Sequence, residues 1–234
     1  MGVLTYQGIK LGRGLFGGGC QYTGDVPVIA DLGSPAALDI DSLIDGATST
    51  ELPNANTKTY TTANIGTSPC DGANTTWIFT CPRNVTCIGT HATSIVATTV
   101  LVTGKDVYGV AMSELLTIAA TGTSTAVSGK KAFKSITSIA ITSAGNSTTN
   151  TVEVGQGDIL GLPYVMSHNT ILKETKDGAA ATAGTTVLAV TTDPATTITG
   201  DVRGTYLPNA ACDGSRYRII YIPTTLTTRG VTQA

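Results

Sequence analysis

The sequence predicts an all-β protein: an antiparallel β-sandwich, jelly-roll or immunoglobulin-like, with an extended N-terminal arm. Forty-three of the 234 residues are threonine, a β-branched residue that fits a pleated, half-buried surface. From Lys58 onward, apolar and polar residues alternate with period two in short runs. Glycine and Asx turn signals separate these runs at intervals of roughly ten residues. This spacing favours a sandwich or barrel over a parallel α/β sheet.

Composition indicates a packed globule with few charges. The chain is 41% hydrophobic and 5% aromatic, with a mean hydropathy of +0.17. Fourteen Lys plus Arg and sixteen Asp plus Glu give a net charge of −2 and a pI near 5.6. Nucleic acids and anionic membranes are recognised by clustered Lys and Arg. We therefore expect neither nucleic acid nor membrane as a partner.

The N-terminal sequence does not read as a targeting segment. Residues 1–6 have no basic region followed by an apolar core, and no stretch approaches the roughly 18 apolar residues of a membrane span. We expect a chain made and folded in a cytoplasm.

Residues 1–56 are expected to form an N-terminal arm. A short strand is predicted at Val3–Leu11, followed by the glycine-rich run Gly12–Cys20. This run matches G-x-G-x-x-G, but a dinucleotide site needs a helix directly after it. The following segment, Gln21–Pro27, is not helical in pattern. A flexible or partner-ordered arm is the better interpretation.

A short helix is predicted between Asp31 and Asp45, within the arm. Ser34 is suited to cap it, with Pro35 at the first helical position. Four carboxylates in this segment are candidate ligands for a calcium ion: Asp31, Asp39, Asp41 and Asp45. Asp-x-Asp alone lacks the glycine and terminal glutamate of an EF-hand loop, so a solvated polar face is favoured.

Residues 57–222 are expected to form the sandwich, followed by a C-terminal tail, residues 223–234. The predicted strands are Lys58–Thr62, Thr75–Cys81, Val85–His91, Ser94–Thr103, Met112–Ala119, Thr123–Ser128, Lys134–Ser143, Thr148–Val154, Asp158–Val165, Thr170–Lys176, Thr186–Thr192, Val202–Tyr206 and Arg216–Ile222. The turn signals between them include Cys70-Asp71-Gly72, Val107-Tyr108-Gly109, Ala144-Gly145-Asn146, Lys176-Asp177-Gly178 and Cys212-Asp213-Gly214.

The cysteines favour reduced thiols over a disulfide framework or a metal site. Their number is odd, and no secretory signal accompanies them. The five are Cys20, Cys70, Cys81, Cys87 and Cys212. A zinc site from Cys81, Cys87 and His91 has an unusual spacing, and residues six apart on a strand lie about 20 Å apart. We predict no metal and no cofactor.

Catalytic constellations are sparse. His91 and His168 are the only histidines, and the sequence contains neither a G-x-S-x-G nucleophile elbow nor a Gly-Asp-Ser motif. The carboxylates best placed for glycoside cleavage are Glu114, Glu153, Glu174 and Asp106. Sugar-cutting enzymes hold sugars on exposed aromatics, whereas burial is expected for Trp77, the single tryptophan. The sequence therefore predicts that the protein is not an enzyme.

The one basic cluster is Lys130-Lys131-Ala132-Phe133-Lys134. Such a lysine-rich turn before a strand is ordinarily a solvated loop or a guarded sheet edge.

Several motifs occur in a familiar order. They are Ala47–Pro53, Pro82-Arg83-Asn84-Val85, Val102–Gly109, Ser113-Glu114, Lys131–Ile139, Val152-Glu153-Val154-Gly155, Asp158–Pro163 and Thr199–Tyr206. In this order the chain after about residue 45 resembles a β-sandwich module of virion structural proteins of tailed bacteriophages. Within that group it is most similar to the small proteins that decorate, or cement, the head shell.

The resemblance implies a non-enzymatic protein that forms a homotrimer on the capsid exterior and clamps subunits of the major capsid protein. The protein would assemble in the host bacterial cytoplasm and reside in the virion. The arm would then spread over the shell, and its apolar residues Leu15, Phe16 and Tyr22 are the predicted capsid contacts.

Two other readings stay open. A tail, fibre-base or head-fibre component would share the same sandwich modules and differ in copy number. A glycan-binding module would show a coplanar row of exposed aromatics, for which Tyr206, Tyr217 and Tyr221 are candidates.

Overall fold

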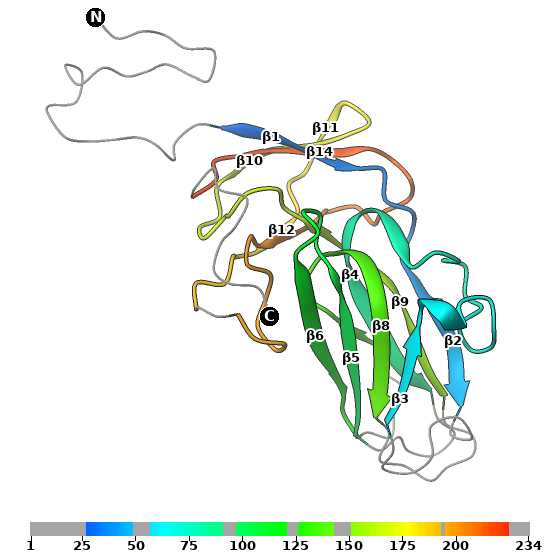
Figure 1. Cartoon of the computed structure of the whole chain (residues 1–234). Helices are drawn as coiled ribbons and strands as arrows, with labels where there is room; N and C mark the ends of the chain where they lie inside the picture. The colour runs from blue at the N-terminus through cyan, green and yellow to red at the C-terminus, as the bar shows by residue number, and fades with distance from the viewer. Residues whose placement is uncertain are drawn as a thin grey trace, which may run out of the picture.

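A computed structural model shows two antiparallel β-sheets, so the predicted all-β sandwich class is confirmed (Figure 1). The structure describes residues 27–48, 57–90, 97–120, 126–142, 151–192 and 195–224. The predicted strand Val3–Leu11, the glycine-rich run and the arm residues Leu15, Phe16 and Tyr22 lie outside these ranges, as does most of the predicted C-terminal tail.

The described elements follow one another as strands with one short 3₁₀ helix. They are β1 (Val28–Gly33), β2 (Asp39–Thr48), β3 (Thr57–Thr61), η1 (Thr62–Asn64), β4 (Ile78–Thr90), β5 (Thr98–Lys105), β6 (Ala111–Ile118), β7 (Val127–Ser128), β8 (Phe133–Thr142), β9 (Thr151–Gly161), β10 (Ile171–Lys176), β11 (Ala179–Ala181), β12 (Thr185–Val187), β13 (Thr205–Leu207) and β14 (Tyr217–Tyr221). Within the described ranges, no helix is long and apolar enough to cross a membrane.

The larger sheet is curled around the main core. Its order is β12-β13-β9-β4-β8-β5-β6, with β2 added to β9, β3 to β8 and β7 to β4. In Figure 1, β2 and β3 are drawn on the same side of the curled sheet. Alternate residues of β5, such as Val100 and Val102, point inward and pack with Trp77, Phe79 and Phe133. The predicted burial of Trp77 is confirmed.

The smaller sheet, β1-β14-β10-β11, lies across one end of the curled sheet (Figure 1). Its inner side chains, including Ala30, Leu32 and Ile219, form a second core with Leu160 and Tyr206 of the larger sheet. This second core joins the two sheets by apolar packing.

Hydrogen bonds reinforce that junction. The Tyr206 hydroxyl on β13 donates to Glu174 Oε2 on β10 at 2.5 Å. The Tyr221 hydroxyl on β14 donates to the Tyr164 carbonyl at 3.1 Å and accepts from the Tyr164 amide at 3.1 Å. Tyr206, Tyr217 and Tyr221, the candidates for an exposed glycan-binding row, are instead buried between the sheets. They therefore cannot offer their rings to a sugar.

Two strands are longer than the sequence suggested. The predicted strands on either side of Pro82 are one strand, β4, with a register shift between Arg83 and Val85. The predicted pair around Gly155 is likewise one strand, β9. Glycine is required at Gly157 because a Cβ atom there would lie 2.2 Å from Asn84 Oδ1. The apparent strand breaks therefore mark close approaches of neighbouring chain segments.

The predicted helix between Asp31 and Asp45 is wrong. The segment forms β1, an extended connection and most of β2. Register shifts in the pairing of β2 with β9 allow the adjacent residues Leu43 and Ile44 both to be fully buried. The bulges therefore produce a spacing of apolar residues that resembles the spacing in a helix. The backbone groups of β2 form their hydrogen bonds with the backbone of β9.

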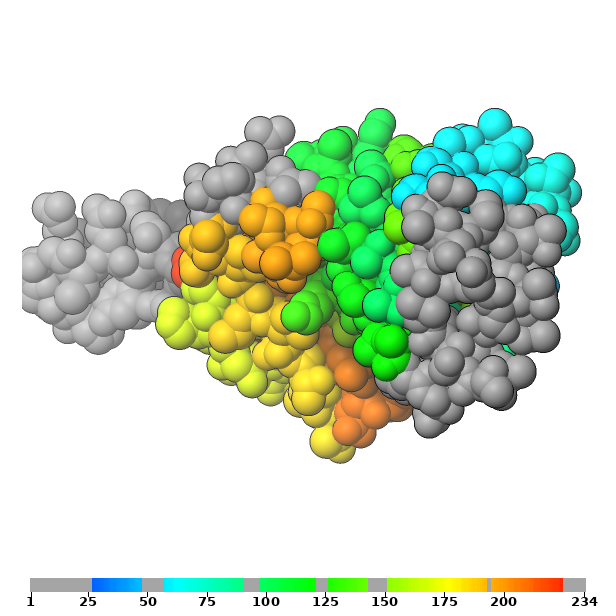
Figure 2. Space-filling model, turned by 90° about the horizontal axis from the view of Figure 1, so that it is seen from below, coloured from blue at the N-terminus to red at the C-terminus, as the bar shows by residue number. Residues whose placement is uncertain are grey.

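The edge strand β6 is covered by a loop. The Leu115 amide of β6 donates to the Thr197 carbonyl at 2.8 Å. Figure 2 shows residues around 200, in orange, lying against the green strands of the larger sheet. Covering an exposed edge removes a site of unwanted strand pairing.

Gly157→Ala tests the close approach of β9 to β4. Asn84 is fully buried, accepts from the Ile159 amide at 3.0 Å and donates to the Gly129 carbonyl at 3.0 Å. The added methyl should displace it and lower the free energy of unfolding by about 2–4 kcal/mol, measured by urea denaturation. Gly200→Ala is the control, since its Cβ would meet only ordinary contacts from 3.5 Å. Equal midpoints for the two variants would contradict this account.

Candidate functional site

The outer face of the smaller sheet carries an apolar patch, which we call the outer-face patch: Ile29, Leu172 and Ile220. Ile29 is 72% exposed and pairs with Ile220, which is partly exposed. Leu172 is 59% exposed and lies in the bulge of β10 beside them. Clustered exposed aliphatic side chains on a sheet face are typical of a contact surface.

Charged residues border this patch on the same sheet. Asp31 forms ion pairs with Arg216 and Arg218, the latter at 3.4 Å. The hydrogen bond from Arg216 lowers the pKa of Asp31. β1 is also an edge strand among the described residues, and it lies within residues 1–56, the range predicted to form the arm. The patch thus combines an apolar centre, a polar border and an open strand edge.

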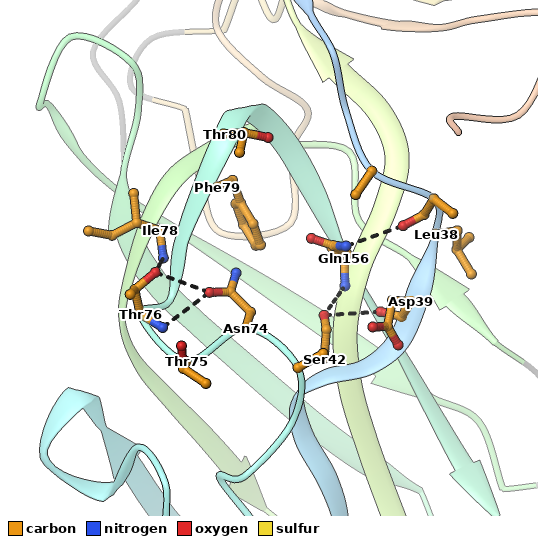
Figure 3. Close-up of a pocket in the computed structure, with 13 residues that line it drawn as sticks. Leu38, Asp39, Ser42, Asn74, Thr75, Thr76, Ile78, Phe79, Thr80 and Gln156 are labelled. Carbon is orange, nitrogen blue, oxygen red and sulfur yellow. Dashed lines mark hydrogen bonds between the residues drawn. The ribbon is translucent and has the colours of Figure 1, made fainter. Parts of the chain in front are cut away.

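A second feature is a groove of about 560 Å³ beside the start of β4 (Figure 3). One wall is the connection between β1 and β2, residues 36–39. The other is formed by residues 73–76 and the beginning of β4, with Gln156 of β9 between them. Leu38 and Ile78, 50% and 56% exposed, stand on opposite sides.

The side chains of the groove are fixed by hydrogen bonds. Asn74 Oδ1 accepts from the Thr76 amide at 3.3 Å, which directs its Nδ2 toward the groove (Figure 3). Gln156 Nε2 donates to the Ala37 carbonyl at 3.2 Å, which directs its Oε1 the opposite way. Ser42 Oγ accepts from the Gln156 amide at 3.2 Å. The groove therefore has preset donors and acceptors.

A third feature is an ion cluster buried beneath the β5–β6 turn. Arg203 Nη1 donates to Asp106 Oδ2 at 2.8 Å, and its Nη2 lies 3.8 Å from Asp201 Oδ1. Asp201 also accepts from the Ala132 amide at 3.2 Å. The Arg203 guanidinium lies 5.3 Å from the ring centre of Tyr108. Burial raises the pKa of Asp201 despite these partners.

Glu114 extends this cluster toward the loop before β8. It accepts from the Lys130 amide at 2.5 Å and from the Lys131 amide at 3.3 Å. Burial raises its pKa to about 7, although these bonds and Lys131 favour the charged form. Lys131 is itself fully buried, and burial lowers its pKa. The prediction of a solvated lysine loop is therefore wrong for Lys131. The negative charges of the buried Glu114 and Asp201 compensate its positive charge inside the protein.

Lys134 also differs from a solvated lysine. Its Nζ donates to the Phe79 carbonyl at 2.6 Å and to the Thr80 carbonyl at 2.8 Å. It thereby satisfies backbone acceptors at the irregular start of β4. Lys130, in contrast, is exposed.

The carboxylates considered for glycoside cleavage lie in three places. Glu114 and Asp106 belong to the buried cluster, and Glu174 bonds Tyr206 between the sheets. Glu153 is half-buried on β9, where burial and the nearby Asp41 and Asp45 raise its pKa. No carboxylate pair faces the groove from opposite sides within the described chain.

The aspartates considered for calcium separate into two groups. Asp31 is on the outer face of the smaller sheet, whereas Asp39, Asp41 and Asp45 are on β2. A hydrogen bond with Asp41 raises the pKa of Asp39. Among the residues that the structure describes, no group of three or more His, Cys, Asp or Glu side chains is arranged to hold a metal.

The remaining reactive groups are the cysteines and His168. Cys70, Cys81, Cys87 and Cys212 are all buried, and burial raises the pKa of Cys87 to about 12. His168 Nδ1 lies 3.1 Å from Ser167 Oγ on the surface. His91 and Cys20 lie outside the described ranges.

No protein-family model, no curated protein and no solved structure matches the chain. Its two antiparallel sheets define it as an all-β sandwich protein.

Glu114→Gln tests the electrostatics of the buried cluster. The folded pKa of about 7 is above the ordinary 4.5, so the Glu114 contribution is greatest below about pH 4.5 and is lost as pH rises to about 7. The loss is at most about 3 kcal/mol. The variant should show a smaller decline in unfolding free energy between pH 5 and pH 8, measured by urea denaturation.

Asp213→Asn is the control, because the pKa of exposed Asp213 is already lowered to about 2 by Lys176. It should leave the decline between pH 5 and pH 8 intact. A decline of equal size in Glu114→Gln would show that Glu114 is not its source.

Proposed function

We propose that the protein is a non-enzymatic virion structural protein of a tailed bacteriophage. It would bind the outside of the head and clamp neighbouring subunits of the major capsid protein, as a decoration or cement protein. The observation that carries the proposal is the outer-face patch: exposed Ile29 and Leu172 on the smaller sheet, with Ile29 on an edge strand a few residues after the predicted contacts Leu15, Phe16 and Tyr22. The sequence motifs supply the identity of the partner.

The proposed clamp needs contact area and little chemistry. A specific protein–protein contact buries roughly 1,600 Å² in total, more than three aliphatic side chains provide. We therefore propose that the patch and the arm residues Leu15, Phe16 and Tyr22 act together. Assembly as a homotrimer would multiply several weak contacts through effective concentration.

The ion pairs of Asp31 suit the border of such a contact. Exposed ion pairs contribute little to stability and are screened by salt. Apolar burial is much less sensitive to salt, so attachment through the patch should survive changes in ionic strength.

The location and copy number of the chain test this proposal. Quantitative mass spectrometry of purified particles should give hundreds of copies, and electron cryomicroscopy should place them on the shell exterior. A few to a dozen copies at a tail or vertex would support the tail or fibre-base alternative instead. Absence of the chain from purified particles would refute both.

The double variant Ile29→Lys with Leu172→Lys tests the patch. Both side chains are largely exposed, so the variant should fold normally but bind capsids at least tenfold more weakly, because buried ammonium groups are costly. Co-sedimentation with capsids lacking the protein measures this. Ile198→Lys, at a site that is 68% exposed and outside the smaller sheet, is the control. Equal binding by both variants would exclude the patch.

Deletion of residues 1–24 tests the arm. Because the described sheets begin at β1, the truncated protein should keep its far-ultraviolet circular dichroism and urea midpoint. It should fail to be retained on capsids in the same assay, since the predicted anchors are lost. Saturation of heads by the truncated protein would contradict the role of the arm.

A further inference from the structure

The groove beside β4 has the chemistry of a peptide-binding site. We propose that it binds an extended, uncharged polypeptide segment with aliphatic side chains. The inference rests on described residues of the groove and does not depend on the capsid assignment.

The polar evidence is a donor and an acceptor that face one another. Asn74 Nδ2 and Gln156 Oε1 have no hydrogen-bond partner among the described residues, while the other end of each amide is held by the protein. Figure 3 shows these two atoms directed into the space between the walls. A peptide backbone presents a carbonyl for Asn74 and an amide N–H for Gln156.

Both a peptide and a sugar offer hydrogen-bond donors and acceptors, and the apolar residues of the groove favour the peptide. Leu38 and Ile78, on opposite sides of the groove, are aliphatic and half exposed. Phe79 lines the groove but is only 2% exposed, so it offers no ring face on which a sugar could stack. Aliphatic side chains of a peptide would cover Leu38 and Ile78.

The charge of the lining disfavours anionic ligands. Asp39 is the only charged side chain among the lining residues, and no Lys or Arg lines the groove. Phosphate and carboxylate ligands are bound by such cations. An uncharged segment is the ligand that this lining favours.

The walls are held in place before a ligand arrives. Arg83 Nη1 donates to the Ala36 carbonyl at 2.9 Å on one wall. On the other, the Asn74 amide donates to the Ser42 carbonyl at 2.8 Å. A fixed groove lowers the cost of ordering on binding, and about 560 Å³ is within the range of ligand sites.

The test uses the full chain labelled with ¹⁵N and two probes. The first is the capped peptide acetyl-Gly-Leu-Gly-Val-Gly-amide, and the second is maltose, a neutral disaccharide. The peptide should cause saturable chemical-shift changes in the Asn74 side-chain amide and in the backbone of residues 36–39 and 73–80, with a Kd of about 1 mM. No saturable change at 20 mM peptide, or changes with maltose only, would overturn the proposal.

Asn74→Asp is the matched variant for the polar contact. It keeps the oxygen that accepts from Thr76 and replaces the Nδ2 donor by a second carboxylate oxygen. Peptide affinity should fall about tenfold, as expected when a hydrogen bond is replaced by repulsion. Asn209→Asp makes the same change at an exposed site outside the groove and should bind as the wild type does. Equal affinities would refute the role of Asn74.

Leu38→Ala and Ile78→Ala test the apolar contacts. Each should reduce affinity about fivefold by removing partly covered aliphatic surface. Ile198→Ala, which changes an exposed residue elsewhere, is the control. Unchanged affinity in both groove variants would refute an aliphatic ligand.

Discussion

The buried ion pair between Arg203 and Asp106 holds together three segments of the chain that are far apart in sequence. Arg203 also donates through Nε to the Leu162 carbonyl at 3.1 Å, so one side chain joins the β5–β6 turn, the chain after β9 and the segment before β13. These segments contain little regular structure. Leaving one member of a buried pair uncompensated costs about 3–5 kcal/mol. The pair therefore fixes the chain after β9, which leads into the smaller sheet, against the β5–β6 turn and the segment before β13 of the larger sheet.

The distribution of charge follows from this arrangement. A protein with few charges places several of them in its interior, where Asp106, Glu114, Lys131, Asp201 and Arg203 are all nearly inaccessible. Threonine hydroxyls provide uncharged polar groups on the strands, and those of Thr57 and Thr142 hydrogen-bond to each other across β3 and β8. The abundant threonine thus has two physical roles, in strand formation and in solvation without charge.

Much of the fold could be predicted from the sequence because strand formation here is governed by local alternation. β5, β6 and β8 show it clearly, and the turn at Asp177-Gly178 joins β10 to β11 with positive φ at both residues, 50° and 83°. Alternation fails where bulges interrupt it, as in β2. It also fails at Pro82, because a proline can be accommodated at an irregular part of a strand.

The candidate surfaces were less accessible to sequence reasoning. Val28 and Ile29 are both apolar, so their order does not reveal which one faces solvent. The fate of Lys131 depends on Glu114, seventeen residues away in sequence, which no local pattern shows. The groove brings together residues from β2, β9 and the segment before β4. Its amide orientations are set by contacts such as that of Gln156 with Ala37, across 119 positions of the chain.

The outer-face patch and the groove share one stretch of chain. β1 carries Ile29, and the connection that follows it forms one wall of the groove. Arg83 fixes this connection at Ala36, donates through Nε to the Gly157 carbonyl at 2.6 Å and pairs with Asp158 at 3.3 Å. Because Arg83 is buried on β4, it ties the connection after β1 to the larger sheet. One buried side chain therefore holds one wall of the groove to β4, the strand whose beginning forms the opposite wall.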